Sequence, residues 1–163
     1  MSIHQSRLAG TNSLVAVAAM TIVTSIHHVY RLGLEVLVPA LVLIALPVLL
    51  LRWQRRSGRR VELWAYAGLN LLTFSWFAFV DGFLDHVIKA LGLQNTTFLP
   101  GGDAETVPTA FHLWSTQAGD LFYEGTGILT FALGLVAMGL TAAFVRTALS
   151  PGVQPEIQHR PGA

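Results

Sequence analysis

The sequence contains no cysteine among its 163 residues. This absence excludes disulfide bonds, thiolate metal sites and redox-active dithiols, so any bound metal must have nitrogen and oxygen ligands. Charged residues are also scarce, at 12% of the chain against about 25% in an ordinary soluble domain. The net charge is +1, and the chain has no basic arm outside residues 52–60. We therefore expect no nucleic-acid partner.

Hydrophobic residues, by contrast, make up 53% of the chain and gather in four long stretches. Each stretch approaches the roughly 20 apolar residues that a helix needs to cross a bilayer. We expect helices at about 12–30, 35–52, 61–90 and 119–147, joined by a long loop at 91–118. No convincing cleavage site follows the first stretch, so we interpret it as a retained helix. The sequence thus predicts an all-α, integral membrane four-helix bundle that forms a single membrane domain over residues 1–163.

Positive charge predicts the orientation of this bundle. Five arginines lie between the second and third helices, in the segment RWQRRSGRR at residues 52–60. Basic loops tend to stay in the cytoplasm, which predicts that both the N- and C-termini are cytoplasmic and that the 91–118 loop is extracytoplasmic. We expect a multi-pass protein of the cell inner membrane whose first partner is the lipid bilayer.

With that orientation, polar residues concentrate at one membrane face. Seven of the nine acidic residues and four of the six histidines fall at or beyond the extracytoplasmic helix ends. They are Glu35, Asp81, Asp85, Asp103, Glu105, Asp120 and Glu124, with His27, His28, His86 and His112. Acidic residues would gather at this face in part because most basic residues lie on the cytoplasmic side. Ionisable groups within membrane helices, however, indicate a functional site by default.

Helical periodicity brings several of these side chains to shared faces. On the third helix Asp81 and Asp85 are four residues apart and point the same way. His86 is expected about 100° further round, at the edge of that face. Asp120 and Glu124 repeat the i,i+4 spacing on the fourth helix.

The two adjacent histidines of the first helix, His27 and His28, point about 100° apart. We expect only one of them to face the centre of the bundle. His112 lies in the 91–118 loop, whose length is typical of a functional segment.

Carboxylates and imidazoles that project inward from facing helices are typical of metal sites in four-helix bundles. The candidate metal ligands are His27, Asp81, Asp85, His86, His112 and Glu124, and the residues expected to orient them are Asp120, His28 and Tyr123. Such ligands favour copper first, then zinc or iron. The spacing matches no strict zinc or dinuclear motif. For each residue alone, a position at the water boundary is the simpler interpretation, and Asp85 could pair with Lys89.

The function that follows is a membrane metal-binding protein that acts in metal handling or in metal-dependent redox chemistry, as an oxidoreductase would. Two alternatives stay open. In a b-type heme protein, His27 or His28 and His86 would bind the iron. A non-catalytic assembly subunit would use the same polar residues to contact a larger membrane complex, or a second copy in a homo-oligomer.

The segments VDGFLDHVIKALGL (80–93) and GDLFYEGTGILTFALG (119–134) resemble an uncharacterised family of small four-helix bacterial membrane proteins. That family carries a G-L-x-D-H-H type motif at the end of one helix. The resemblance covers roughly the second half of the chain. This sequence lacks the second histidine after His86 and has a longer loop. The resemblance implies a membrane fold and a role for Asp85 and His86, but no particular activity.

Overall fold

The structure, a computed structural model, describes residues 3–93 and 115–150, and all of its regular elements there are helical. The elements are α1 (Ile3–Leu32), the short 3₁₀ helix η1 (Leu34–Val36), α2 (Leu37–Ser57), α3 (Arg60–Thr73), the π-helix η2 (Phe74–Val87), α4 (Ile88–Ala90) and α5 (Thr116–Leu149). Because α3, η2 and α4 follow one another without a break, they form one long helix. The described residues therefore form four long helices, and each is long and apolar enough to cross a membrane.

The predicted all-α class and the four long helices are confirmed. The helices are longer than the hydrophobic runs that indicated them. The first begins at Ile3 instead of about residue 12, because a polar stretch continues the helix beyond the apolar core. The middle of the predicted 91–118 loop lies outside the described residues.

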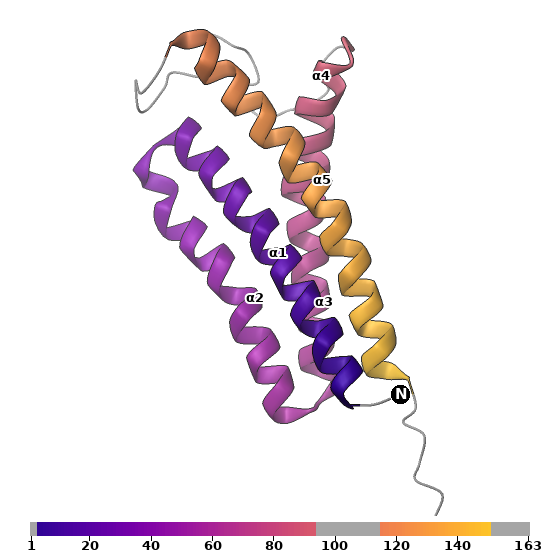
Figure 1. Cartoon of the computed structure of the whole chain (residues 1–163). Helices are drawn as coiled ribbons and strands as arrows, with labels where there is room; N and C mark the ends of the chain where they lie inside the picture. Colours follow the sequence, from indigo (N-terminus) through magenta and orange to yellow (C-terminus); the bar gives the residue numbers. More distant parts are fainter. Residues whose placement is uncertain (1–2, 94–114, 151–163) are drawn as a thin grey trace, which may run out of the picture.

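Figure 1 shows α1 between α2 and α5, with the long α3–η2–α4 helix packed against α5. The start of α1, the turn between α2 and α3, and the end of α5 lie at one end of the bundle, which we call the arginine end. The turn between α1 and η1, together with α4 and the start of α5, lies at the other, which we call the histidine end. Gly33 (φ 87°) and Gly58 (φ 65°) make the two tight turns, in a backbone region that glycine adopts without strain.

The core is layered along the bundle axis. A central layer of small and flexible apolar residues joins α1, η2 and α5, and consists of Ala16, Val17, Met20, Ala78 and Ala137. A Cβ on Gly134 of α5 would overlap that of Ala78, so these two helices approach closely. Helix α2 contributes little to this core and exposes most of its aliphatic side chains, Val38, Leu41 and Leu49 among them.

Near the arginine end the core contains a buried hydrogen-bonded cluster. The hydroxyl of Ser13 lies 3.0 Å from Tyr66 Oη and 2.9 Å from Thr141 Oγ1. Asn70 Nδ2 donates to Thr141 Oγ1 at 3.4 Å. This cluster joins α1, α3 and α5, and hydrogen bonds of this kind hold helices together in an apolar environment.

The π-helix η2 carries the acidic residues of the third helix. Its hydrogen bonds run from residue i+5 to residue i, as in the bond from the Ile88 N–H to the Phe83 carbonyl. Turns of this type are rare and occur often at functional sites. The wider turn brings i+4 and i+5 to one face, so Asp85 and His86 are both buried with Asp81. His86 is therefore fully inside the bundle, whereas α-helical periodicity placed it at the edge of the face.

Candidate metal centre

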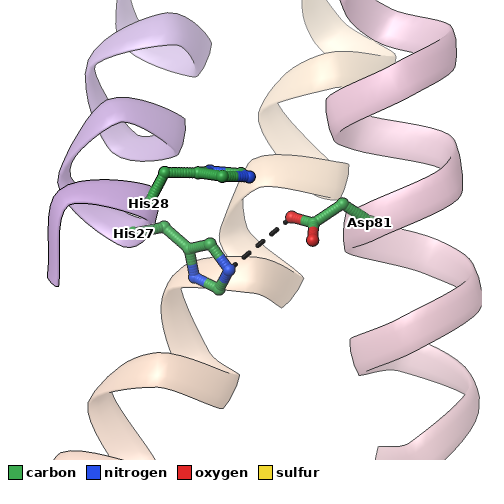
Figure 2. A group of neighbouring side chains, drawn as sticks. All are labelled: His27, His28 and Asp81. Carbon is green, nitrogen blue, oxygen red and sulfur yellow. Dashed lines mark ion pairs between the residues drawn. The ribbon is translucent and has the colours of Figure 1, made fainter. Parts of the chain in front are cut away.

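His27, near the end of α1, is fully buried and held by α5. Its Nδ1 lies 2.9 Å from the hydroxyl oxygen of Thr126. That hydroxyl donates its proton to the carbonyls of Phe122 and Tyr123, at 2.8 and 3.0 Å. Because its proton is already donated, the hydroxyl oxygen accepts a hydrogen bond from Nδ1–H of His27. The neutral ring therefore carries its proton on Nδ1 and its lone pair on Nε2. Nε2 is buried, has no hydrogen-bond partner in the described part of the chain, and lies 3.6 Å from Asp81 Oδ2 (Figure 2).

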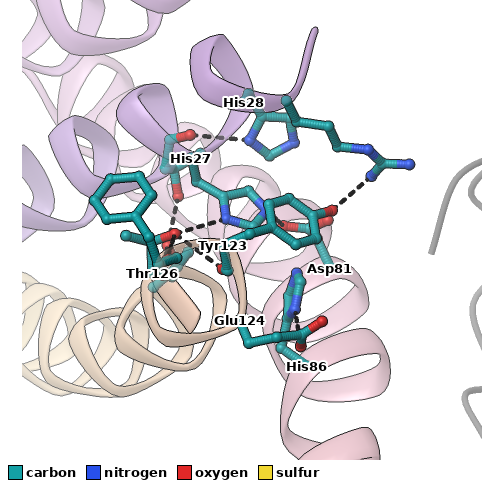
Figure 3. Close-up of polar contacts among 11 residues, drawn as sticks. His27, His28, Asp81, His86, Tyr123, Glu124 and Thr126 are labelled. Carbon is teal, nitrogen blue, oxygen red and sulfur yellow. Dashed lines mark hydrogen bonds and ion pairs between the residues drawn. The ribbon is translucent and has the colours of Figure 1, made fainter. Parts of the chain in front are cut away.

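His86, from η2, is fixed in a parallel way. Its Nδ1 lies 2.9 Å from Glu124 Oε2, and the other oxygen of this carboxylate accepts from Lys89 Nζ at 2.6 Å. A carboxylate accepts, so Nδ1 carries the proton and Nε2 of the neutral ring has the lone pair. Nε2 is buried and has no hydrogen-bond partner among the described residues (Figure 3). A carboxylate that holds the second nitrogen of a histidine is typical of metal-binding imidazoles.

Asp81 lies between these two histidines in the bundle interior. It is 1% exposed, and neither carboxylate oxygen has a hydrogen bond to a described residue. The 3.6 Å separation from His27 Nε2 exceeds the length of a normal hydrogen bond. Because a buried polar group without partners is costly, such a carboxylate requires a positively charged or hydrogen-bonding species beside it.

Two groups of three residues that could bind a metal ion meet at Asp81. One consists of His27, His28 and Asp81, and the other of Asp81, Asp85 and His86. In each group one donor atom per residue lies within 4.8 Å of the others. Donor atoms that bind one ion at about 2.0–2.2 Å lie somewhat less than 4.8 Å from one another. Small side-chain rotations would therefore bring the donor atoms of either group to metal-binding distance. The arrangement can hold one ion, or two ions with Asp81 as the shared ligand.

His28 takes part in the first group although it is only half buried. Its Nδ1 lies 2.9 Å from the Thr24 carbonyl oxygen and donates to it. Its Nε2 therefore has the lone pair when the ring is neutral. His27 faces the core and is buried, so the two adjacent histidines differ in burial as expected, but both contribute donor atoms.

Tyr123 forms the wall of the site on the α5 side. Its ring stacks on His27 with centroids 4.3 Å apart and an interplanar angle of 16°, and its centroid lies 4.9 Å from that of His86. Arg31 donates to the phenol oxygen at 2.9 Å. These contacts hold both imidazoles in place and bring a positive charge to the rim of the acidic cluster.

Two glycines, Gly82 and Gly127, allow η2 and α5 to pack closely beside His86. A Cβ on Gly127 would overlap the His86 ring, and a Cβ on Gly82 would lie 2.9 Å from the Gly127 carbonyl oxygen. The His86 imidazole therefore occupies the space that a side chain at position 127 would fill.

The structure thus brings together His27, Asp81, Asp85 and His86 as the sequence analysis grouped them. Glu124 was also predicted as a ligand, but its carboxylate contacts His86 and Lys89, which is the orienting position predicted for Asp120. Asp120 is half buried and has no hydrogen bond or ion pair to the described residues. His112, the remaining predicted ligand, lies outside the described residues.

Sequence reasoning missed Thr126, which determines the tautomer of His27. Threonine hydroxyls on apolar helices usually bond to their own backbone, and Thr126 does this as well. The signal present in the sequence is that Thr126 lies three residues after Tyr123, so the two residues share a helix face.

Loss of either orienting residue should weaken metal binding without preventing it. We expect Thr126→Val and Glu124→Gln each to lower metal affinity by about 10–100-fold, as outer-shell changes do. Thr126→Ser keeps a hydroxyl and should restore most of the affinity. Isothermal titration with the metal salt measures these values. Equal affinities for the valine, serine and native proteins would contradict the role of Thr126.

Comparisons of the chain with protein-family models, curated proteins and solved structures find no match. The resemblance to small four-helix bacterial membrane proteins therefore stays a prediction, and the geometry of the site carries the functional argument.

Proposed function

We propose that this chain is an integral protein of the cell inner membrane, with both termini on the cytoplasmic side. Four helices of sufficient length and apolarity support this proposal. The exposed side chains of α2 are almost entirely aliphatic up to Arg52, where the basic turn begins. Aliphatic surface of this extent suits lipid contact, and the arginines of residues 52–60 favour the cytoplasmic face.

We further propose that the histidine end binds a transition-metal ion, copper first and zinc or iron next, in metal handling or metal-dependent redox chemistry. The observation that carries this proposal is the pair of buried imidazoles, His27 and His86. In each, Nδ1 is fixed by another side chain and Nε2 has no hydrogen bond to any residue that the structure describes. Two such donors beside the buried carboxylate of Asp81 form a ligand set for a divalent ion of the imidazole-binding type.

The same geometry favours an ion over a heme. The rings of His27 and His86 pack edge to face with centroids 4.8 Å apart. Two imidazoles that bind one iron from opposite faces of a porphyrin must be further apart than rings in direct contact. The carboxylates of Asp81 and Asp85 would also be unfavourable neighbours for an anionic cofactor.

Elemental analysis of the purified protein, together with its optical spectrum, tests the proposal. We expect one or two equivalents of copper, zinc or iron per chain, and no Soret band. Protein that is purified in detergent, supplied with each metal in turn and still metal-free after desalting would overturn the metal site. A Soret band would replace it with heme. Recovery of the expressed protein in the soluble fraction would overturn membrane insertion.

A further inference from the structure

The arginine end of the bundle has two neighbouring hollows between α1 and α2. The first, of about 650 Å³, is lined by His4, Arg7, Leu8, Thr11 and Arg55. The second, of about 300 Å³, is lined by Leu14, Val48, Leu51, Arg52, Arg55 and Arg56. Arg55 lines both, so the two hollows meet at its side chain.

The side chain of Arg55 is positioned by contacts from α2 to α1. Its Nη2 donates to Thr11 Oγ1 at 2.8 Å and to the Arg7 carbonyl at 3.2 Å. The Thr11 hydroxyl itself donates to that carbonyl at 3.0 Å. These bonds occupy two of the five N–H groups of a guanidinium, so the others can serve a ligand. Fixing the arginine beforehand lowers the entropic cost of binding an anion.

The charged side chains that line the two hollows are arginines. Four arginines line them, Arg7, Arg52, Arg55 and Arg56, and none of the described residues that line them is acidic. Glu62, an acidic residue in the first turn of α3, lines neither hollow. It is buried, and its Oε1 lies 3.8 Å from Arg59 Nε. The hollows therefore suit an anionic group.

The second hollow also has an apolar floor, formed by Leu14, Val48 and Leu51 below the arginines. A ligand that fits both hollows carries an anionic head beside a hydrocarbon chain. We propose that this end of the bundle binds an anionic phospholipid of the cytoplasmic leaflet, with its phosphate at Arg7 and Arg55 and an acyl chain along the floor. Basic pockets between membrane helices on this side bind acidic headgroups. The inference rests on membrane insertion and is independent of the metal site.

Native mass spectrometry of the detergent-solubilised protein tests this proposal with phosphatidylglycerol and with phosphatidylcholine of the same acyl chains. We expect phosphatidylglycerol to bind more tightly. Arg7→Gln combined with Arg55→Gln should lower its affinity on the order of tenfold. The matched control combines Arg60→Gln with Arg146→Gln, which removes the same charge from exposed positions outside both hollows. This control should bind like the native protein.

A second variant pair, Arg52→Gln with Arg56→Gln, keeps the contacts of Arg55 to α1 and should also weaken phosphatidylglycerol binding. Equal affinity for the two lipids, or equal losses in the test and control pairs, would overturn the proposal. Glycerol phosphate that binds as tightly as the phospholipid would overturn the part played by the apolar floor. Metal content, measured on the same samples, should stay unchanged in every variant, so a failure here is distinct from a failure of the metal site.

Discussion

Asp81→Asn should abolish the proposed metal binding and leave the fold intact. Asp81 belongs to both ligand groups, so its loss breaks either site. We expect metal affinity to fall by more than the roughly 10–100-fold that an outer-shell change costs. The amide has nearly the same volume as the carboxylate and can donate to His27 Nε2, which has no hydrogen-bond partner among the described residues. The metal-free variant should therefore melt at the same temperature as metal-free native protein or higher.

Metal content after desalting and thermal unfolding in detergent measure the two parts of this prediction. Asp120→Asn is the matched control, because this acidic residue lies on α5 near the histidine end and has no hydrogen bond to a described residue. It should keep its metal. His86→Ala should lose metal as Asp81→Asn does, whereas Tyr66→Phe, in the cluster near the arginine end, should not. Native metal content in Asp81→Asn would show that the ligands lie elsewhere.

Gly127→Ala should displace the His86 imidazole. A Cβ at this position would overlap the ring, so either the ring must move or η2 and α5, which approach closely at Gly82 and Gly127, must move apart. Overpacking of this kind costs about 1–3 kcal/mol. We expect a lower melting temperature and weaker metal binding together, because the ring that moves carries a proposed ligand atom.

Gly125→Ala provides a sharp control for that change. Gly125 lies two residues earlier on α5, and a Cβ there meets nothing within 4 Å. Alanine should stabilise the helix at this position by about 0.5–1 kcal/mol, because glycine loses more backbone entropy on folding. The two variants should therefore shift the melting temperature in opposite directions. If Gly127→Ala retained native metal affinity and stability, His86 would not occupy the position described.

The helical architecture could be predicted from the sequence because hydrophobic runs and basic turns act locally. Each run is long enough to form a helix alone, and the arginines of residues 52–60 mark the turn between α2 and α3. The helix ends were less accurate, since the polar residues that extend α1 back to Ile3 carry no apolar signal.

The composition of the site was predictable in part. Ionisable residues are rare on this chain, so the acids and histidines of the third helix stood out from their surroundings. The division of roles among them was not accessible, because it depends on which side chain of α5 faces which histidine. Glu124 reaches His86 and Thr126 reaches His27 through the packing of helices that are distant in sequence.

The wide turn of η2 makes the spacing of the site sensitive to chain length. In an ordinary α-helix, positions five residues apart such as 81 and 86 point about 140° apart, so Asp81 and His86 would not share a face. Removing a single residue from Phe74–Val87 could tighten the segment into regular α-helix while the helix still crossed the same thickness of protein. The chain would then still fold into four helices, but Asp81 and His86 would point in separate directions. A change of length in this segment would therefore preserve the fold and disrupt the cluster of histidines and aspartates.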